Sequence, residues 1–154
     1  MMETAGNAYL AFDIADEHYA VDVARVEVVL EMAAITRVPK SARQLRGVIN
    51  HRGSVVPVVD LRVIFGMEQT LIREGIAVIV TQIEVDNTLI TAGFLADAVH
   101  EVIDLDTGFV APPPSFGVRS DGDFVKGIAQ RGSDFIILLD LEKAISASVG
   151  IERE

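Results

Sequence analysis

The chain has 154 residues, a formal net charge of −10 at neutral pH, and no cysteine. Without cysteine the sequence offers neither a disulfide framework nor a thiolate metal site, and its acidity argues against a nucleic-acid surface, because a polyanion would be repelled. Half of the residues are apolar and only 6% are aromatic. Val and Ile dominate the apolar residues, which is typical of β-rich cores.

The first elements expected are two short strands, 9–14 and 19–22, joined by a polar corner. Asp22 is placed to cap a single helical turn after them. A short helix is expected over 41–46, ended by Gly47. Basic residues gather around this helix, and we interpret them as a solvated face, the alternative being a contact with an acidic protein. They are Arg37, Lys40, Arg43, Arg46 and Arg52.

Residues 46–62 are the most informative stretch, reading Arg-Gly-Val-Ile-Asn-His-Arg-Gly-Ser-Val-Val-Pro-Val-Val-Asp-Leu-Arg. A short apolar strand leads to a tight turn at Arg52 and Gly53, where glycine supplies a positive φ. The strand that follows is apolar on both faces and predicted to be buried. Because Pro57 cannot donate to a ladder, this strand should lie at a sheet edge or carry a bulge.

Asp60 is placed to cap a short helix that begins at Leu61 and ends at Gly66. The same strand, turn, strand and cap recur over 126–141, with the Gly-to-Asp spacing identical and Arg-Gly-Ser at both turns. This indicates an internal duplication. We predict two small β-barrels, near residues 8–66 and 76–146, joined by a linker over 68–75.

A barrel of about 65 residues buries only about 60% of its unfolded surface, so the two halves should pack together as one domain, 1–154. A C-terminal helix is expected over 141–148, with Leu141, Ala144, Ile145 and Val149 facing the barrels. The proline-containing loop 104–123 is predicted to be extended and irregular. Strand edges left open between barrels would favour protein binding, whereas the 42–46 helix and this loop could instead cover them.

Motifs for chemistry are absent from the sequence. His18, His51 and His100 are far apart and form no i, i+4 pair, which disfavours a metal site. No nucleophile elbow or phosphate-binding loop exists. We therefore expect no catalytic residue, no metal and no cofactor, and we favour a binding or scaffolding role over an enzyme.

The N-terminus lacks the basic start and apolar core of a signal peptide, and every apolar run ends well before the roughly 18 residues of a spanning helix. We expect a cytoplasmic protein without direct membrane insertion.

The stretch from Gly47 to Arg62 resembles the signature Gly-x-x-Asn-Leu-Arg-Gly-x-x-x-Pro-x-x-Asp-Leu-Arg of the CheW family of chemotaxis coupling proteins. Further segments extend the resemblance over most of the chain. The residues that carry the signature are Gly47, Asn50, Arg52, Gly53, Pro57, Asp60, Leu61 and Arg62. The resemblance implies a mostly β fold of two five-strand SH3-like barrels packed together, with short helices including one at the C-terminus.

It also implies a non-catalytic adaptor that joins the signalling tips of methyl-accepting chemoreceptors to the regulatory domain of the histidine kinase CheA. Arg52 would lie beside the receptor-binding groove, with Val26, Glu27, Val28 and Val99 as further candidates. For the valines, the alternative is ordinary barrel core.

The chain departs from the family pattern at two places. His51 stands where leucine is usual, adding a group that titrates near neutral pH. Glu27 comes one residue early, and in a strand one step points a side chain to the opposite face. Either a bulge restores its pairing with Arg52, or Glu31 replaces it, or the pairing is lost.

Two rival functions stay open. One is a CheW-fold regulatory module for another chemosensory output, such as pili or cyclic-dinucleotide synthesis. The other is an enzyme or small-ligand binder on a double barrel, which a deep polar pocket with converging titratable groups would favour.

Overall fold

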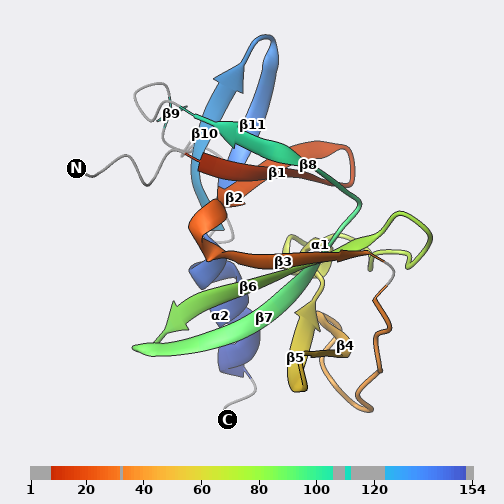
Figure 1. Ribbon diagram of the computed structural model, residues 1–154. Helices are drawn as coiled ribbons and strands as arrows, with labels where there is room; N and C mark the ends of the chain where they lie inside the picture. Colours follow the sequence, from red (N-terminus) through yellow and green to blue (C-terminus); the bar gives the residue numbers. More distant parts are fainter. Residues whose placement is uncertain (1–7, 32, 106–109, 112–123, 152–154) are drawn as a thin grey trace.

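The computed structural model describes residues 8–31, 33–105, 110–111 and 124–151, with side chains to residue 146. Its strands form two sheets, one above the other in Figure 1. The terminal subdomain has the strand order β8-β1-β2-β11-β10-β9, and the central subdomain has the order β3-β6-β7-β5-β4. The prediction of a mostly β fold with two subdomains is confirmed, although a two-residue sixth strand joins the terminal sheet.

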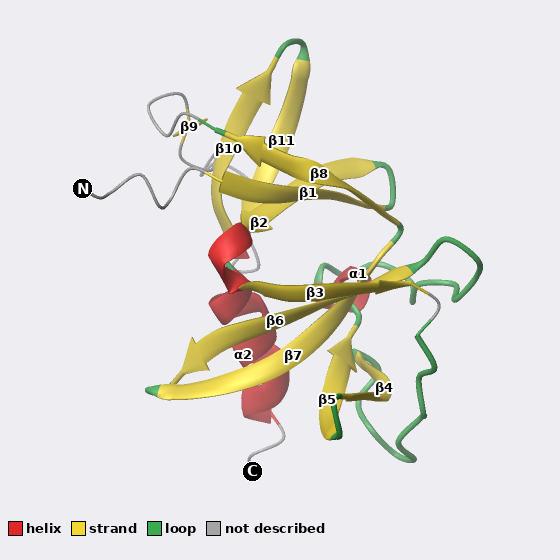
Figure 2. Ribbon diagram, viewed as in Figure 1, coloured by secondary structure: helices red, strands yellow, loops and turns green. Residues whose placement is uncertain are grey.

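The terminal subdomain contains β1 (Ala8–Ile14), β2 (Glu17–Asp22), β8 (Ala98–Asp104), β9 (Val110–Ala111), β10 (Val125–Arg131) and β11 (Asp134–Leu139). The central subdomain contains β3 (Val26–Glu31), β4 (Leu45–His51), β5 (Ser54–Val59), β6 (Ala77–Val85) and β7 (Thr88–Ala96). Figure 2 shows how little helix accompanies them: the 3-10 turn η2 (Val23–Arg25), α1 (Leu61–Ile64) and α2 (Leu141–Ile151).

The two halves of the sequence exchange their first hairpins, so the prediction of one barrel near 8–66 and another near 76–146 is wrong about strand partners. Hairpin β1–β2 lies between β8 and β11, both from the second half. Hairpin β6–β7 lies between β3 and β5, both from the first half. The joins to β11 and β5 are parallel. Hydrophobic patterns define strands, but they do not say which distant strand each will pair with.

The repeated unit has the same backbone features in both copies. Strand β4 shifts register between Leu45 and Gly47, and β10 shifts between Val125 and Gly127. In both units a preceding segment crosses the glycine: Thr36 bridges Val48, and β9 pairs with β10 at Ile128 and Ala129. A Cβ on Gly47 would lie 2.3 Å from the Thr36 carbonyl oxygen. Only glycine allows that approach.

Two local predictions fail in the central subdomain. Residues 41–46 contain turns and the start of β4 rather than a helix. A helix this short is not stable by itself, and pairing of Leu45 with Val59 takes its place. The second prediction that fails is that Pro57 places its strand at a sheet edge or at a bulge, because β5 is internal, between β7 and β4. Pro57 is tolerated there because it falls at a non-hydrogen-bonded position of the hairpin, and the ladder to β7 begins only at Val58.

The largest core cluster joins both subdomains. It combines Phe12 and Tyr19 of the terminal sheet with Ile79 and Phe94 of the central sheet, all buried. Helix α2 follows β11 of the terminal subdomain yet packs on β6 of the central one (Figure 1). Its buried residues are Leu141, Ala144 and Ile145, whereas the side chain of Val149 and most of the loop 104–123 lie outside the description. Residues of both subdomains therefore contribute to one hydrophobic cluster.

Candidate protein-interaction site

Glu27 is the extra residue of a bulge in β3. Val26 pairs with Thr81 and Val28 pairs with Val80, so Glu27 has no opposite residue. A bulge re-aims the side chains beside it. The sequence left three arrangements open, and the structure has the one in which a bulge restores the pairing: Glu27, rather than Glu31, faces Arg52.

The β4–β5 hairpin presents Arg52 to solvent. Arg52 and Gly53 form its two-residue turn with positive φ angles of 55° and 82°, which is the type I′ geometry. The Asn50 side chain fixes the turn by accepting a hydrogen bond from Gly53 N, with Oδ1 and N 2.9 Å apart. The Arg52 side chain is 79% exposed. Its guanidinium is therefore available to a partner.

Three polar side chains surround the Glu27 carboxylate. Gln82 Nε2 donates to Glu27 Oε1 at 3.1 Å. His51 Nε2 lies 3.4 Å from Oε2, and Arg52 Nη1 lies 3.9 Å from the same oxygen. The pairing with Arg52 is loose and exposed, so it contributes little to stability. Sequence reasoning missed Gln82, which belongs to β6 and reaches Glu27 only through sheet pairing.

The three valine candidates are all half-buried, which fits both of the interpretations left open for them. Val26 and Val99 pack against the shared core, from the central and terminal subdomains respectively. Val28 packs against the separate core cluster of the central sheet. Each therefore supports the fold while leaving part of its surface exposed.

The two Arg-Gly-Ser triplets occupy different places in their hairpins. In the first, Arg52 and Gly53 form the turn; in the second, Gly132 and Ser133 do, and Arg131 is the last residue of β10. Arg52 comes five positions after the bulge glycine Gly47, whereas Arg131 comes four positions after Gly127. Arg52 therefore has no equivalent in the terminal subdomain.

Asp60 has a structural role. Its side chain is completely buried and accepts four hydrogen bonds: from Arg62 N, Thr70 N, Thr70 Oγ1 and Arg46 Nη1. Arg46 also donates to the Thr70 carbonyl. The interpretation of Arg46 as part of a solvated face is therefore wrong, because it forms an ion pair of 2.7 Å inside the fold. This network holds the 66–76 segment against α1.

Arg62 joins the two subdomains. Its Nη2 lies 2.6 Å from Asp97 Oδ2, at the crossing from β7 to β8. The same carboxylate oxygen accepts a hydrogen bond from Ala15 N, in the β1–β2 turn. The end of the family signature thus fixes the relative position of the sheets.

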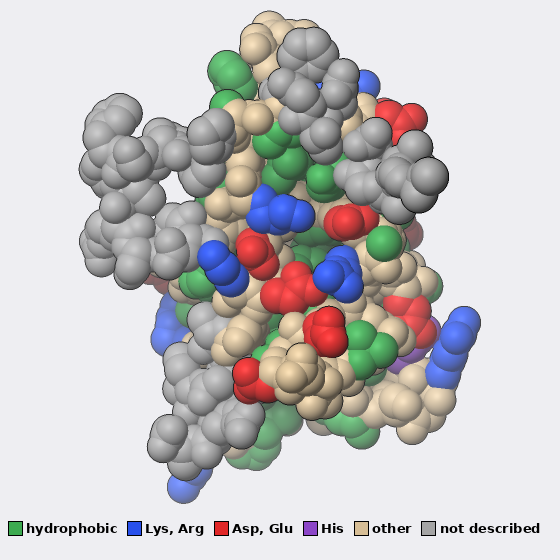
Figure 3. All heavy atoms as spheres, turned by 90° about the vertical axis from the view of Figure 1, so that its left-hand side faces the viewer, with side chains coloured by type: hydrophobic (Ala, Val, Ile, Leu, Met, Phe, Trp, Pro, Cys, Tyr) green, Lys and Arg blue, Asp and Glu red, His purple; other side chains and the backbone are tan. Residues whose placement is uncertain are grey.

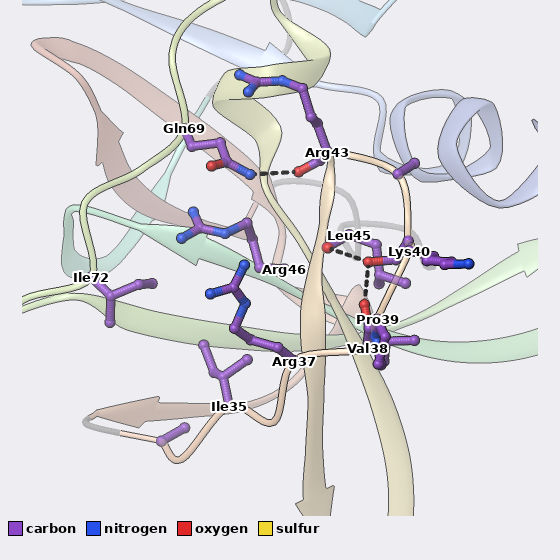
Figure 4. A pocket seen from close by; sticks show the side chains of 13 residues that line it. Ile35, Arg37, Val38, Pro39, Lys40, Arg43, Leu45, Arg46, Gln69 and Ile72 are labelled. Carbon is purple, nitrogen blue, oxygen red and sulfur yellow. Dashed lines mark hydrogen bonds between the residues drawn. The ribbon is translucent and has the colours of Figure 1, made fainter.

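A basic cleft lies beside the start of β4 (Figure 4). It has a volume of about 780 Å³ and combines an apolar part, including Ile35 and Ile72, with basic side chains. Arg46 is held by Asp60, whereas Arg37, Lys40 and Arg43 make no ion pair among the described residues. Within the part of the chain that the structure describes, these three cations have no carboxylate partner and can receive carboxylates of another protein.

The charges on another face are mixed. On the face shown in Figure 3, Lys and Arg side chains alternate with Asp and Glu over the middle of the molecule. Interspersed charges of both signs do not provide the continuous positive surface that nucleic acids require.

Asp13, His18 and His100 form a third cluster, which sequence reasoning missed. His18 Nδ1 lies 2.7 Å from Asp13 Oδ1, and His100 Nε2 lies 2.9 Å from Asp13 Oδ2. Partial burial acts to raise the pKa of Asp13, but hydrogen bonds and charges from both histidines outweigh it, so the pKa is lowered. The hydrogen bond to Asp13 and its negative charge raise the pKa of His18.

The model of the CheW-like domain matches residues 8–149. The chain belongs to the CheW-like family. It is 35% identical over 143 residues to the chemotaxis protein CheW of Thermotoga maritima, covering 88% of this chain and 85% of that protein. It is 30% identical over 145 residues to CheW of Klebsiella aerogenes, covering 94% and 85%.

A solved structure of the scaffolding protein TtCheW from Thermoanaerobacter tengcongensis matches this fold with a TM-score of 0.77, at 33% identity, over 90% of this chain and 92% of that one. This CheW-like chain is accordingly a non-catalytic adaptor of chemotaxis. Within its described part, no helix is long and apolar enough to cross a membrane.

Proposed function

We propose that this chain couples the cytoplasmic tips of methyl-accepting chemoreceptors to the regulatory domain of the histidine kinase CheA. The observation that carries the receptor half of the proposal is the presentation of Arg52. Its side chain is 79% exposed on a two-residue turn, and Glu27, its one ion-pair partner among the described residues, is 3.9 Å away. Such an arginine can exchange a weak internal pair for a stronger one with a partner carboxylate.

Glu27 and His51 tune this arginine. The Glu27 carboxylate accepts a hydrogen bond from Gln82 and lies beside His51. It is therefore held at 3.9 Å from the Arg52 guanidinium, where the two groups form only a loose ion pair. A receptor carboxylate approaching Arg52 must compete with Glu27, whereas a basic residue of the receptor can pair with Glu27 directly. The two charges together favour a partner surface that carries both signs.

The basic cleft supports a second, separate contact, which we assign to the kinase. An adaptor must bind two partners at once, so its surfaces cannot overlap. The cleft includes Arg46 near the start of β4, and Arg52 follows the end of that strand, so six residue steps of about 3.3 Å place them about 20 Å apart. Arg37, Lys40 and Arg43 would receive acidic side chains of the kinase regulatory domain.

Arg52→Ala is expected to weaken binding of a receptor signalling fragment about 5- to 30-fold, since an arginine at an interface contributes about 1–2 kcal/mol or more. Isothermal titration calorimetry with the purified fragment measures this. Arg131→Ala is the matched control, because Arg131 belongs to the other Arg-Gly-Ser triplet but lies at the end of β10, outside the turn. Equal affinities for wild type and Arg52→Ala, with normal melting curves, would remove Arg52 from the receptor site.

The double variant Arg37→Glu/Lys40→Glu is expected to weaken binding of the kinase regulatory domain at least 10-fold and to leave receptor binding unchanged, because like charges replace complementary ones. Both affinities are measured on the same preparation. If the double variant loses receptor binding instead, the assignment of the two surfaces is reversed. If it loses neither, the cleft is not a partner surface and the receptor contact at Arg52 stands independently.

A further inference from the structure

Three potential ligand groups converge where β1, β2 and β8 meet. Asp13 lies directly opposite His18 in the β1–β2 hairpin. On its other side, β1 pairs with β8, where a register shift places two residues, His100 and Glu101, opposite Ala11. This bulge re-aims the His100 side chain toward Asp13. The convergence depends on the exchange of hairpins between the sequence halves.

The distances are compatible with a shared metal ion. One ligand atom from each of the three residues lies within 4.8 Å of the others, and the two imidazole rings are 6.5 Å apart between centroids. Four-coordinate zinc needs nitrogen and oxygen ligands about 2.0–2.1 Å from the metal, hence about 3.3 Å from one another. The contacts of 2.7 and 2.9 Å that His18 and His100 make with the two oxygens of Asp13 need to open by about 0.5 Å, and a ligand pair at the 4.8 Å limit needs to close by about 1.5 Å. The side chains of His18 and His100 are 49% and 45% exposed, so they have room to make these shifts.

The surroundings favour a cation. A shallow cavity of about 180 Å³ lies at the cluster, open to solvent and able to hold water as a fourth ligand. The charged residues that line it or act on His18 are the acids Asp13, Glu17, Glu101 and Asp134 and the single base Arg131. Negative charge is therefore in excess even before a metal enters.

We propose that Asp13, His18 and His100 form a binding site for a divalent transition-metal ion, with zinc the best match to two imidazoles and one carboxylate. The donor set also admits cobalt, nickel and copper, whereas magnesium and calcium prefer oxygen ligands alone. A bound ion would fasten the β1–β2 hairpin to β8, which is an edge strand of the terminal sheet. This site is independent of the adaptor contacts at Arg52 and the basic cleft.

Calorimetric titration of zinc chloride into the untagged, chelator-treated full chain tests the proposal. We expect saturable binding of one ion per chain, and at least a 10-fold loss of affinity in His18→Ala and in His100→Ala. His51→Ala is the matched control, because this third histidine lies beside Glu27 and should leave zinc affinity unchanged. Absence of saturable binding, or loss of binding in His51→Ala but not in the other two variants, would overturn the proposal.

Two further measurements keep the test decisive if a variant fails to fold. Cobalt bound to the wild-type chain should give the intense visible absorption of a four-coordinate site, and zinc should displace it. In nuclear magnetic resonance spectra of the wild-type histidine rings, zinc should shift the signals of His18 and His100 and leave that of His51 in place. Shifts of all three signals would mean that zinc binds histidines without selectivity, and no shift would mean that zinc does not bind. Either result would overturn the proposal and leave Asp13, His18 and His100 as a hydrogen-bonded cluster only.

Discussion

Replacing Asp60 with alanine is expected to lower the free energy of unfolding by about 3–5 kcal/mol, because removing one member of a buried ion pair leaves the other uncompensated. Asp60 is fully buried, and its oxygens accept hydrogen bonds from Arg46, Thr70 and the backbone of Arg62. The variant loses all of these at once. The 66–76 segment and the basic cleft, which includes Gln69 and Ile72, should loosen as a result.

Asp140 supplies the matched control, because it occupies the same place in the second copy of the repeat. It caps α2 through a 3.1 Å hydrogen bond from Lys143 N, but it is only partly buried and makes no ion pair in the described structure. Asp140→Ala should therefore cost only about 1 kcal/mol, the usual value of a cap. Urea unfolding of both variants measures the difference. Equal losses would mean that capping, rather than the buried network with Arg46, accounts for the stability that Asp60 provides.

The contrast between Asp60 and Asp140 marks the limit of local prediction. The sequence places both residues correctly as caps, since the apolar strand before each one and the helical residues after it are local signals. The sequence does not reveal that Thr70, ten residues on, folds back over Asp60, or that Arg46 is drawn into the interior. Those contacts depend on tertiary packing, which no spacing in this stretch encodes.

Tertiary packing also explains two wrong predictions, the helix over 41–46 and the strand partners of the two barrels. Residues 41–46 contain good helix formers, but pairing of Leu45 with Val59 overrides that preference. The repeat is visible in the sequence, but the exchange of hairpins is not, because each strand has the same apolar pattern whichever copy it pairs with. His100 is 87 residues from Asp13, so their contact exists only once β1 and β8 are neighbours.

At the Arg52 site, the family resemblance and the alternation of side chains along a strand together narrowed the position of Glu27 to three possibilities. Alternation along β3 would place Glu27 on the wrong face, and the bulge needed to correct this was one of three possibilities. Its presence depends on the register of β3 against β6, with Thr81 and Val80 opposite Val26 and Val28. A bulge is a property of a pair of strands, so the sequence of one strand could only leave the question open.

Replacing Gly47 with alanine is expected to destabilise the fold by about 2–5 kcal/mol, combining a strained backbone with overpacking. Gly47 has a φ of 147°, which side chains disfavour, and its Cβ would lie 2.3 Å from the Thr36 carbonyl oxygen and 2.7 Å from Ile35 Cγ2. Backbone cannot yield as a side-chain end can. The bridge between Thr36 and Val48 must therefore break, and urea unfolding should record the loss.

Alanine substitutions at two other glycines separate the two causes, steric overlap and backbone strain. A Cβ on Gly127 would meet Val110 Cγ1 at 2.6 Å, which can move, and the Ala111 carbonyl oxygen at 2.9 Å, so Gly127→Ala should cost less than Gly47→Ala. Gly53 has a φ of 82° and open space around it, so Gly53→Ala should cost only about 1 kcal/mol of backbone strain. If Gly53→Ala were as damaging as Gly47→Ala, strain alone would explain both losses, and the close crossing of Thr36 would not be what requires glycine at the bulge.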